Sequence, residues 1–174
     1  MMWAIVCLTP QWRLVMEQKS LSRWLKIVIL GVALCGLIVY FLIIPSYGGM
    51  MARMYPEFSY CYWPWLIFLW GTAVPCYIAL YLGWRIAGNI GKDRSFSLEN
   101  ASLLKWIAWL AAGDVCYFFL GNIVLWFSGM NHPGIVLYSL LVDFAGIAIC
   151  VAAAALSHLV KKAADLQEQS DLTI

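Results

Sequence analysis

The chain has 174 residues and a formal net charge of +2; 64% of its residues are hydrophobic and 11% are charged. A soluble domain of ordinary composition carries about 25% charged residues, and a soluble fold of this length could not bury so much apolar surface. Lipid must therefore cover it, which predicts an all-α integral membrane protein, and the small net charge argues against direct nucleic-acid binding.

Residues 1–20 are predicted to be an N-terminal extension ahead of the membrane domain. The opening MMWAIVCLTPQWRLV has a short apolar patch, but it lacks the preceding basic residues and the small-residue cleavage site of a signal peptide. Met16 is an alternative start, which would place the basic run of MEQKSLSRWLK directly before the first span.

Four apolar stretches are long enough to cross a bilayer, which takes about 20 helical residues. They cover residues 24–44, 63–84, 103–127 and 134–160. Backbone groups in lipid must be paired within the segment, so each stretch is expected to be a helix. The first is expected to stop at Pro45, and Pro75 is expected to kink the second. Residues 21–160 thus form a predicted four-helix bundle, followed by a tail over residues 161–174.

Basic residues indicate the direction of the spans. They gather before the first span, between the second and third, and after the fourth, whereas the first connection carries only Arg53 and the third carries none. The positive-inside rule then predicts that both termini and the middle connection are cytoplasmic. On the opposite side, YCYWPW (residues 60–65) is typical of an aromatic belt at headgroup depth, with an aromatic ligand site as the alternative.

Two acids, Asp114 and Asp143, lie inside predicted spans. An Asp at the centre of a membrane helix costs about 2.5–3.5 kcal/mol, so neither should face lipid. In an antiparallel hairpin, Asp143 lies about 7 Å nearer the outer surface than Asp114, so the two carboxyl groups share a cavity without touching. Two interpretations stay open: a proton or cation relay, or neutral acids hydrogen-bonded to Tyr117, Asn122 or a backbone carbonyl.

The fourth span carries two stripes of small or polar residues at helical spacing. The first consists of Asp143, Gly146, Cys150, Ala153 and Ser157, and the second of Ala145, Ala148, Ala152 and Ala155. Small residues let membrane helices approach closely. The fourth span is therefore expected to pack on both sides and to occupy the centre of the bundle.

The middle connection and the tail are the main segments outside the membrane. Ser97 is a good N-cap for the third helix, and Glu99 suits the positive end of that helix. The tail is expected to continue the fourth helix past Lys161 and Lys162. Its apolar end is either disordered or captured by a groove in another protein.

The pattern of reactive residues favours a non-enzymatic protein. The six cysteines show no CxxC spacing, and His132 and His158 are expected at opposite membrane faces. There is no nucleophile–base arrangement, phosphate-binding loop or dinucleotide turn in the sequence. We therefore expect no catalytic residues, no metal site and no cofactor.

Two short stretches resemble a known family. DRSFSLENASLLKWIAWL is similar to the middle signature of the bacterial domain-of-unknown-function 2975 membrane proteins, and ADLQEQSDLTI resembles their terminal signature. The resemblance extends over roughly residues 21–174, although Gln169 and Ser170 depart from a more acidic family version. The residues on motif positions are Phe96, Ser97, Glu99, Asn100, Leu166, Gln167, Asp171, Leu172, Thr173 and Ile174.

The resemblance implies a multi-pass protein of the bacterial cytoplasmic membrane without established enzymatic chemistry. Such proteins are often encoded beside a small Cro/CI-type helix-turn-helix regulator, so the motif residues are expected to dock such a soluble partner. Two alternatives stay open: a small transporter or proton- or cation-coupled protein that uses Asp114 and Asp143, and a structural or immunity-type membrane protein. The sequence leaves the oligomeric state open.

Overall fold

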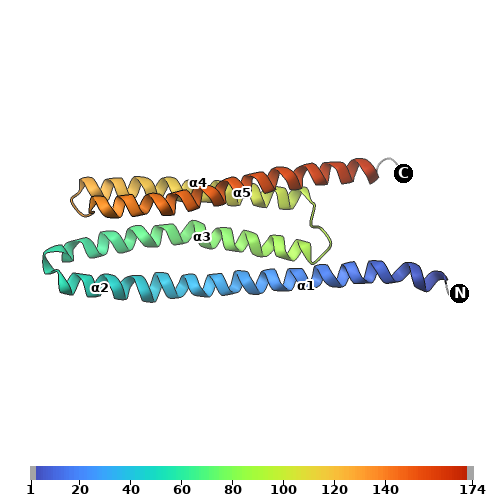
Figure 1. The fold of residues 1–174 in the computed structure, drawn as a ribbon, viewed down its shortest axis with the longest axis horizontal. Coiled ribbons are helices and arrows are strands. Elements are labelled where there is room, and N and C mark those ends of the chain that lie inside the picture. Colours follow the sequence, from blue (N-terminus) through green and yellow to red (C-terminus); the bar gives the residue numbers. More distant parts are fainter. Residues whose placement is uncertain (1–2, 172–174) are drawn as a thin grey trace.

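The computed structural model describes the backbone of residues 3–171 and the side chains of residues 18–170, and all its regular elements are helical. Two elements are short: η1 is a single π turn and η2 is a 3₁₀ helix. In chain order the elements are α1 (Trp3–Ile38), η1 (Val39–Ile43), α2 (Ile44–Met54), η2 (Pro56–Cys61), α3 (Tyr62–Ile90), α4 (Leu98–Phe127) and α5 (Pro133–Asp171) (Figure 1).

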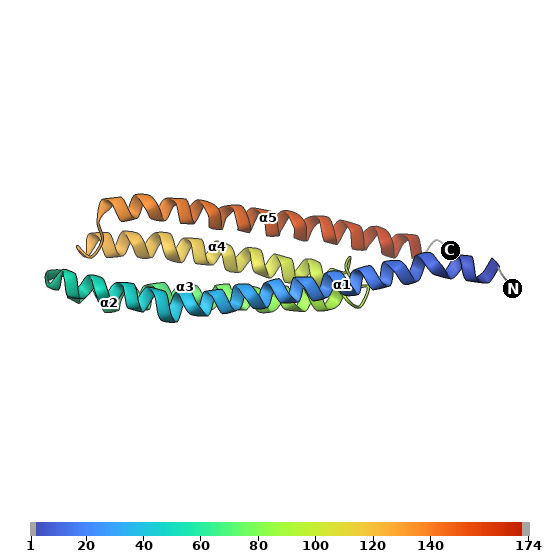
Figure 2. The same cartoon turned by 60° about the horizontal axis from the view of Figure 1, so that its bottom comes forward.

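The long helices lie antiparallel in an open row. Helix α1 packs against α3, α3 against α4, and α4 against α5, while the backbone of α5 approaches no described element other than α4 (Figures 1 and 2). The expected position of the fourth span at the centre of the bundle is therefore wrong, because α3 and α4 occupy the centre. The physical reason is that α5 buries one small-residue stripe, whereas Ala145 and Ala152 of the second stripe are exposed.

The buried stripe of α5 lies on α4, as its spacing predicts. The Cys150 thiol donates to the Ala108 carbonyl oxygen at 3.3 Å, and the Ser157 hydroxyl donates to the Ala101 carbonyl oxygen at 2.7 Å. A side chain at Gly146 would collide with α4. Small residues therefore let the two backbones approach closely enough for direct hydrogen bonds between side chain and backbone.

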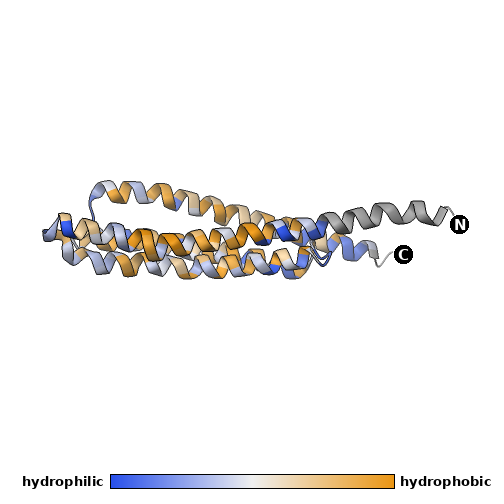
Figure 3. Cartoon of the chain, turned by 90° about the horizontal axis from the view of Figure 1, so that it is seen from below, coloured by the Kyte–Doolittle hydropathy of each residue, from blue (hydrophilic) through white to orange (hydrophobic). Residues whose placement is uncertain are grey.

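Four helical segments are long and apolar enough to cross a membrane, which confirms the predicted number of spans. They are Gln18–Met54, Pro56–Ile90, Leu98–Phe127 and Pro133–Ser170. Figure 3 shows hydrophobic residues along most of the length of these helices and hydrophilic residues toward the C-terminal end of α5. The helices are longer than the apolar stretches, so several turns extend beyond the apolar part of the molecule.

The first span does not stop at Pro45, contrary to the sequence-based expectation. Helix α1 passes through the π turn into α2, where Pro45 lies in the first turn and Tyr55 closes the end. In the π turn the N–H of Ile44 bonds to the Val39 carbonyl oxygen, five residues back. The π turn shifts the hydrogen-bond pattern, so Pro45 lies in a first helical turn, where its missing N–H is tolerated.

Tight turns join the central helices to their neighbours. At the end of α4 the N–H of Met130 donates to the Leu125 carbonyl oxygen at 2.9 Å, and the N–H of Gly129 donates to the Trp126 carbonyl oxygen at 3.0 Å. This pattern is the Schellman motif, which needs a positive φ at Gly129; the observed φ is 69°. At the end of α3, Asp93 holds the same position with a φ of 61°.

Replacing Gly129 with alanine should destabilise the α4–α5 hairpin by about 1 kcal/mol, because a Cβ disfavours the left-handed conformation. Gly113→Ala within α4 is the control, since neither glycine has an atom within 4 Å of an added Cβ and Gly113 has no positive φ. Thermal unfolding in detergent micelles should show a lower midpoint for the first variant only. Equal midpoints would contradict this account of the turn.

Candidate functional site

The middle connection is held in place by one buried side chain, Asn100, which is 1% exposed. Its amide nitrogen donates to the carbonyl oxygens of Arg94 at 2.9 Å and Ser95 at 3.0 Å, and its amide oxygen accepts from Asn89 at 2.8 Å. The predicted N-cap is confirmed, because the Ser97 hydroxyl accepts from the Asn100 N–H at 3.2 Å. The connection is therefore folded onto the ends of both central helices.

An ion pair joins the same two helices on their surface. The Arg85 guanidinium lies 2.7 Å from the Glu99 carboxylate, and both side chains are about half exposed. Because water and salt screen such a pair, it contributes little to stability, on the order of 0–1 kcal/mol. Glu99 thus has a structural partner in addition to its place in the first turn of α4.

Helix α1 is tied to α3 at this same end of the molecule. The buried Ser22 hydroxyl donates to the Ala87 carbonyl oxygen at 2.6 Å, and the Lys26 ammonium lies 5.4 Å from the centre of the Trp84 ring. A cation above an indole face is attracted by the ring quadrupole. These contacts fix the beginning of the first candidate span beside the middle connection.

The two motif stretches meet at this end. Phe96 and Gln167 both line a pair of adjoining hollows of about 400 and 440 Å³, which together we call the terminal groove. Figure 1 shows the C-terminal turns of α5 extending beyond the α3–α4 connection. Asp93 also lines both hollows. The remaining lining residues are Arg94, Ser97, Leu98, Ala164 and Glu168 in the first hollow and Gln18, Leu21, Ile90 and Ser95 in the second.

The motif residues divide into two groups. Phe96, Ser97 and Gln167 line the groove. Leu166 precedes Gln167 in the chain and has 57% of its surface exposed. Glu99 and Asn100 act instead as structural supports through the contacts above. Of the tail residues, Asp171 is described only as the last backbone position of α5. Leu172, Thr173 and Ile174 lie outside the described residues.

Sequence reasoning missed the contribution of the first helix to this groove. Gln18 and Leu21 line it, and Leu21 is about half exposed. The signal for these residues is weak: one apolar residue inside the polar, basic run that precedes the first span. Its proximity to Phe96 depends on how far α1 extends beyond the bilayer, which hydropathy does not show.

The two intramembrane acids contact different neighbours. Asp143 is 6% exposed, and neither of its carboxyl oxygens has a hydrogen-bond partner among the described residues. Asp114 accepts from the Cys76 thiol of α3, with 3.6 Å between sulfur and oxygen. Tyr117 and Asn122, named as partners in one of the two interpretations, donate instead to backbone carbonyl oxygens of α3 and α4. Asp114 thus faces α3, whereas Asp143 lies in the stripe that packs on α4.

Comparison with known proteins decides the family. The family model described as "Protein of unknown function (DUF2975)" matches residues 46–174, which is most of the chain. The chain belongs to the DUF2975 family. It is also 29% identical over 152 residues to the uncharacterized membrane protein YoaS of Bacillus subtilis (strain 168), covering 86% of this chain and 94% of that protein. No solved structure matches.

The match gives this DUF2975 protein its broad character. Together with the four candidate spans, the similarity to a Bacillus membrane protein identifies a multi-pass membrane protein. The matched range contains both stretches that line the terminal groove, whereas it begins after Gln18 and Leu21. The groove is thus built mainly, although not entirely, from the part of the chain that matches the family.

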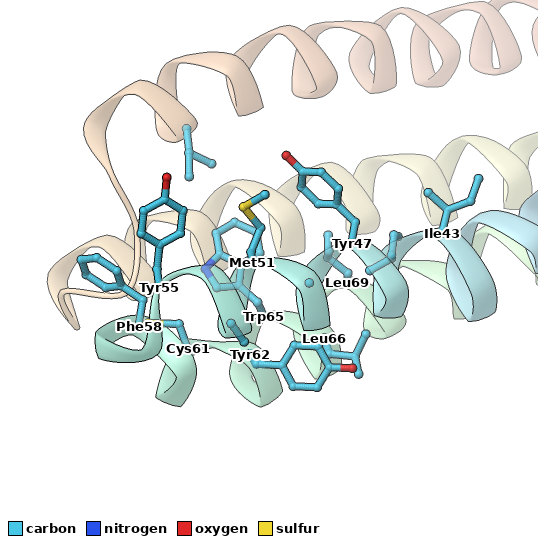
Figure 4. A pocket seen from close by; sticks show the side chains of 14 residues that line it. Ile43, Tyr47, Met51, Tyr55, Phe58, Cys61, Tyr62, Trp65, Leu66 and Leu69 are labelled. Atoms are coloured by element: carbon cyan, nitrogen blue, oxygen red, sulfur yellow. The ribbon is translucent and has the colours of Figure 1, made fainter.

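A second cavity of this DUF2975 protein lies at the opposite end of the helices. It has a volume of about 460 Å³ and almost entirely apolar walls, between α2, η2, α3 and the beginning of α5 (Figure 4). The Trp65 indole N–H donates to the Met130 carbonyl oxygen at 3.0 Å and so fixes one wall. The larger lining side chains are Tyr47, Met51, Tyr55, Phe58, Tyr62 and Trp65.

Two residues of the aromatic stretch YCYWPW line this cavity, namely Tyr62 and Trp65. These two side chains therefore form part of a cavity wall, a role that the expected aromatic belt does not describe. Tyr47, Tyr55 and Phe58 were not predicted as lining residues, because the first helix was expected to stop at Pro45. Their place follows from the continuation of the first helix through that proline.

Proposed function

We propose that this DUF2975 protein is a non-enzymatic adaptor of the bacterial cytoplasmic membrane that docks a soluble regulatory protein, such as a small helix-turn-helix regulator, at its terminal groove. The observation that carries the proposal is that Phe96 and Gln167, from two motif stretches far apart in the sequence, line the same groove. Convergence of separate motifs on one exposed surface is expected of a binding surface. It is not needed for packing within lipid.

The distribution of charge supports a cytoplasmic position for this groove. The α3–α4 connection and the C-terminal end of α5 lie at the same end of the molecule as the beginning of α1 (Figure 1). Among residues 18–170 this end holds every basic residue except Arg53. By the positive-inside rule such an end is retained in the cytoplasm, which supports a cytoplasmic position for the groove.

The groove has the chemistry of a protein-docking surface. Phe96 is 59% exposed although it lies in a polar connection, and an exposed aromatic side chain is a typical anchor for a partner. Asp93 and Glu168 line the same groove. Anionic headgroups repel such carboxylates, so a soluble protein fits this surface better than the membrane does.

A cross-linked purification of the tagged protein from its native membranes, read by mass spectrometry, tests this function. The variant Phe96→Ala/Leu166→Ala should reduce the yield of a soluble partner by roughly 10-fold or more, since exposed anchor residues carry much of the binding energy. Phe127→Ala/Leu137→Ala is the matched control, because both residues are highly exposed at the opposite end. If both variants capture the same soluble proteins as the original chain, the adaptor function is wrong.

Transport remains a second candidate because Asp143 is buried with both carboxyl oxygens unpartnered among the described residues. A buried acid of this kind marks an ion or proton pathway in many membrane proteins. It is the weaker candidate here, since Asp114 bonds to Cys76 of α3 while Asp143 packs on α4. A relay through both residues would have to cross α4 itself.

A further inference from the structure

A third cavity lies between α4 and α5, on the membrane side of the terminal groove. Its volume is about 460 Å³, and it joins cationic side chains to an apolar floor. We call it the lysine cavity. The side chains that the argument uses are Lys105, Ala108 and Trp109 of α4 and Ala154, His158 and Lys161 of α5.

The cavity carries positive charge that no described side chain neutralises. Lys105 and Lys161 are both exposed, and the single ion pair among the described residues joins Arg85 to Glu99 elsewhere. No carboxylate lines the cavity. On α5 the next acid is Asp165, one turn beyond Lys161 and outside the lining. Two lysines without carboxylate partners favour an anionic ligand.

The register of the hairpin brings the two lysines toward each other. Ser157 bonds to Ala101, and the lysines lie one turn from these residues in opposite directions, so their Cα atoms are about 12 Å apart along the axes. Helical side chains lean toward the N-terminus of their own helix. Because the helices are antiparallel, Lys105 leans toward the terminal groove and Lys161 leans into the membrane. Both lysines line the same cavity as His158, which lies between them along the axes.

The rest of the cavity is apolar and belongs to the candidate spans. Ala108 and Ala154 leave a shallow floor because their side chains are small, and the exposed Trp109 forms a wall. Trp109 suits headgroup depth, where an indole lies partly in lipid. A cationic rim above an apolar floor matches a molecule with an anionic head and a hydrocarbon tail.

We propose that the lysine cavity is a specific site for an anionic membrane phospholipid. Its phosphate lies between Lys105, His158 and Lys161, and an acyl chain covers Ala108 and Ala154. Basic pockets between membrane helices at headgroup depth bind anionic lipid headgroups in this way. The site is distinct from the terminal groove and does not depend on the adaptor function. Free phosphate shares the headgroup chemistry but cannot use the apolar floor.

The experiment is a binding measurement on the full chain purified in a non-ionic detergent. Native mass spectrometry would count bound phosphatidylglycerol, with phosphatidylcholine and inorganic phosphate as separate arms. Lys105→Gln/Lys161→Gln should weaken phosphatidylglycerol binding roughly 30-fold. Lys92→Gln/Lys162→Gln removes the same charge from exposed residues outside the cavity and should leave binding unchanged. Ala154→Leu, which fills the floor without changing charge, should also weaken binding.

The outcomes separate the sources of the anion. Retention of phosphatidylglycerol by the original chain and the Lys92→Gln/Lys162→Gln variant, with loss in the other two variants, supports the site. An equal loss of binding in the two lysine-pair variants would overturn it, because the attraction would then be a general effect of charge. Unchanged binding by the Lys105→Gln/Lys161→Gln variant would overturn it as well. Equal binding of phosphatidylcholine would overturn the role of the lysines. Inorganic phosphate that competes at the same concentration as the lipid would overturn the lipid as occupant.

Discussion

Asn100→Ala is expected to loosen the middle connection and to lower the free energy of unfolding by about 2 kcal/mol, since buried groups left unpaired cost more than the bonds contribute. The change removes the two bonds that Asn100 donates to the carbonyl oxygens of Arg94 and Ser95 and the one that it accepts from Asn89. The measurements are the thermal unfolding midpoint in detergent and the rate of trypsin cleavage after Lys92 and Arg94.

Asn122→Ala is the matched control for this prediction. Asn122 is also 1% exposed and lies on the same helix, but its amide donates to the Phe118 carbonyl oxygen at the opposite end of α4. Both variants should lose stability, whereas only Asn100→Ala should accelerate cleavage in the middle connection. If cleavage after Arg94 is equally fast in both, Asn100 does not hold this connection in place.

The membrane character and the number of spans could be predicted from sequence, because a bilayer imposes a length and a composition on each helix. The hydrogen bond at the start of α4 was also predictable, because local chemistry restricts the residue type there. Ser97 could be recognised as an N-cap because the residue type that satisfies a free N–H at a helix start is nearly fixed. The stripe that includes Cys150 and Ser157 followed from helical spacing alone.

The predictions failed where a neighbour's position decides the outcome. Pro45 was expected to end the first helix, but a π turn at Val39–Ile43 changes the bonding pattern ahead of it. A stripe of small residues shows that close packing is possible, but it does not show that packing occurs. Ala145 and Ala152 are exposed, so the second stripe led to a wrong prediction of where α5 lies. The partner of Asp114, Cys76, lies on α3 and follows from a register that no pattern in the sequence reveals.

The terminal groove shows a similar division. Its motif stretches could be recognised singly from their resemblance to a family, but their contact depends on the lengths of α1, α3 and α5 beyond the apolar stretches. Phe96 and Gln167 line the same groove because α5 continues as a helix past Lys161, as the sequence predicted. Leu21 lines it as well because α1 begins before the first span, which was not predicted. Hydropathy describes the part of a helix in lipid and says little about the part outside it.

Gly121→Ala is expected to destabilise the contact between the two central helices by about 3 kcal/mol, as overpacking does when the neighbours cannot move. An added Cβ would overlap the ring of Phe68, which is buried on α3. That ring is confined on its other sides: it stacks on Phe118 with 5.6 Å between ring centres and meets Trp65 edge-on at 5.7 Å. The midpoint of thermal unfolding in detergent should fall clearly below that of Gly113→Ala, whose added Cβ has open space.

A second substitution tests whether the destabilisation by Gly121→Ala comes from a steric clash with Phe68 or from a change in α4 itself. Phe68→Leu removes the ring that Gly121→Ala would strike, so the double variant Gly121→Ala/Phe68→Leu should be more stable than the sum of the two single changes predicts, by roughly 1–3 kcal/mol. Additive effects would show that Phe68 is not the obstacle. Phe68 also contacts Trp65, which lines the apolar cavity at the opposite end from the terminal groove. A strongly positive coupling would therefore place Gly121 among the residues that hold the wall of that cavity in position.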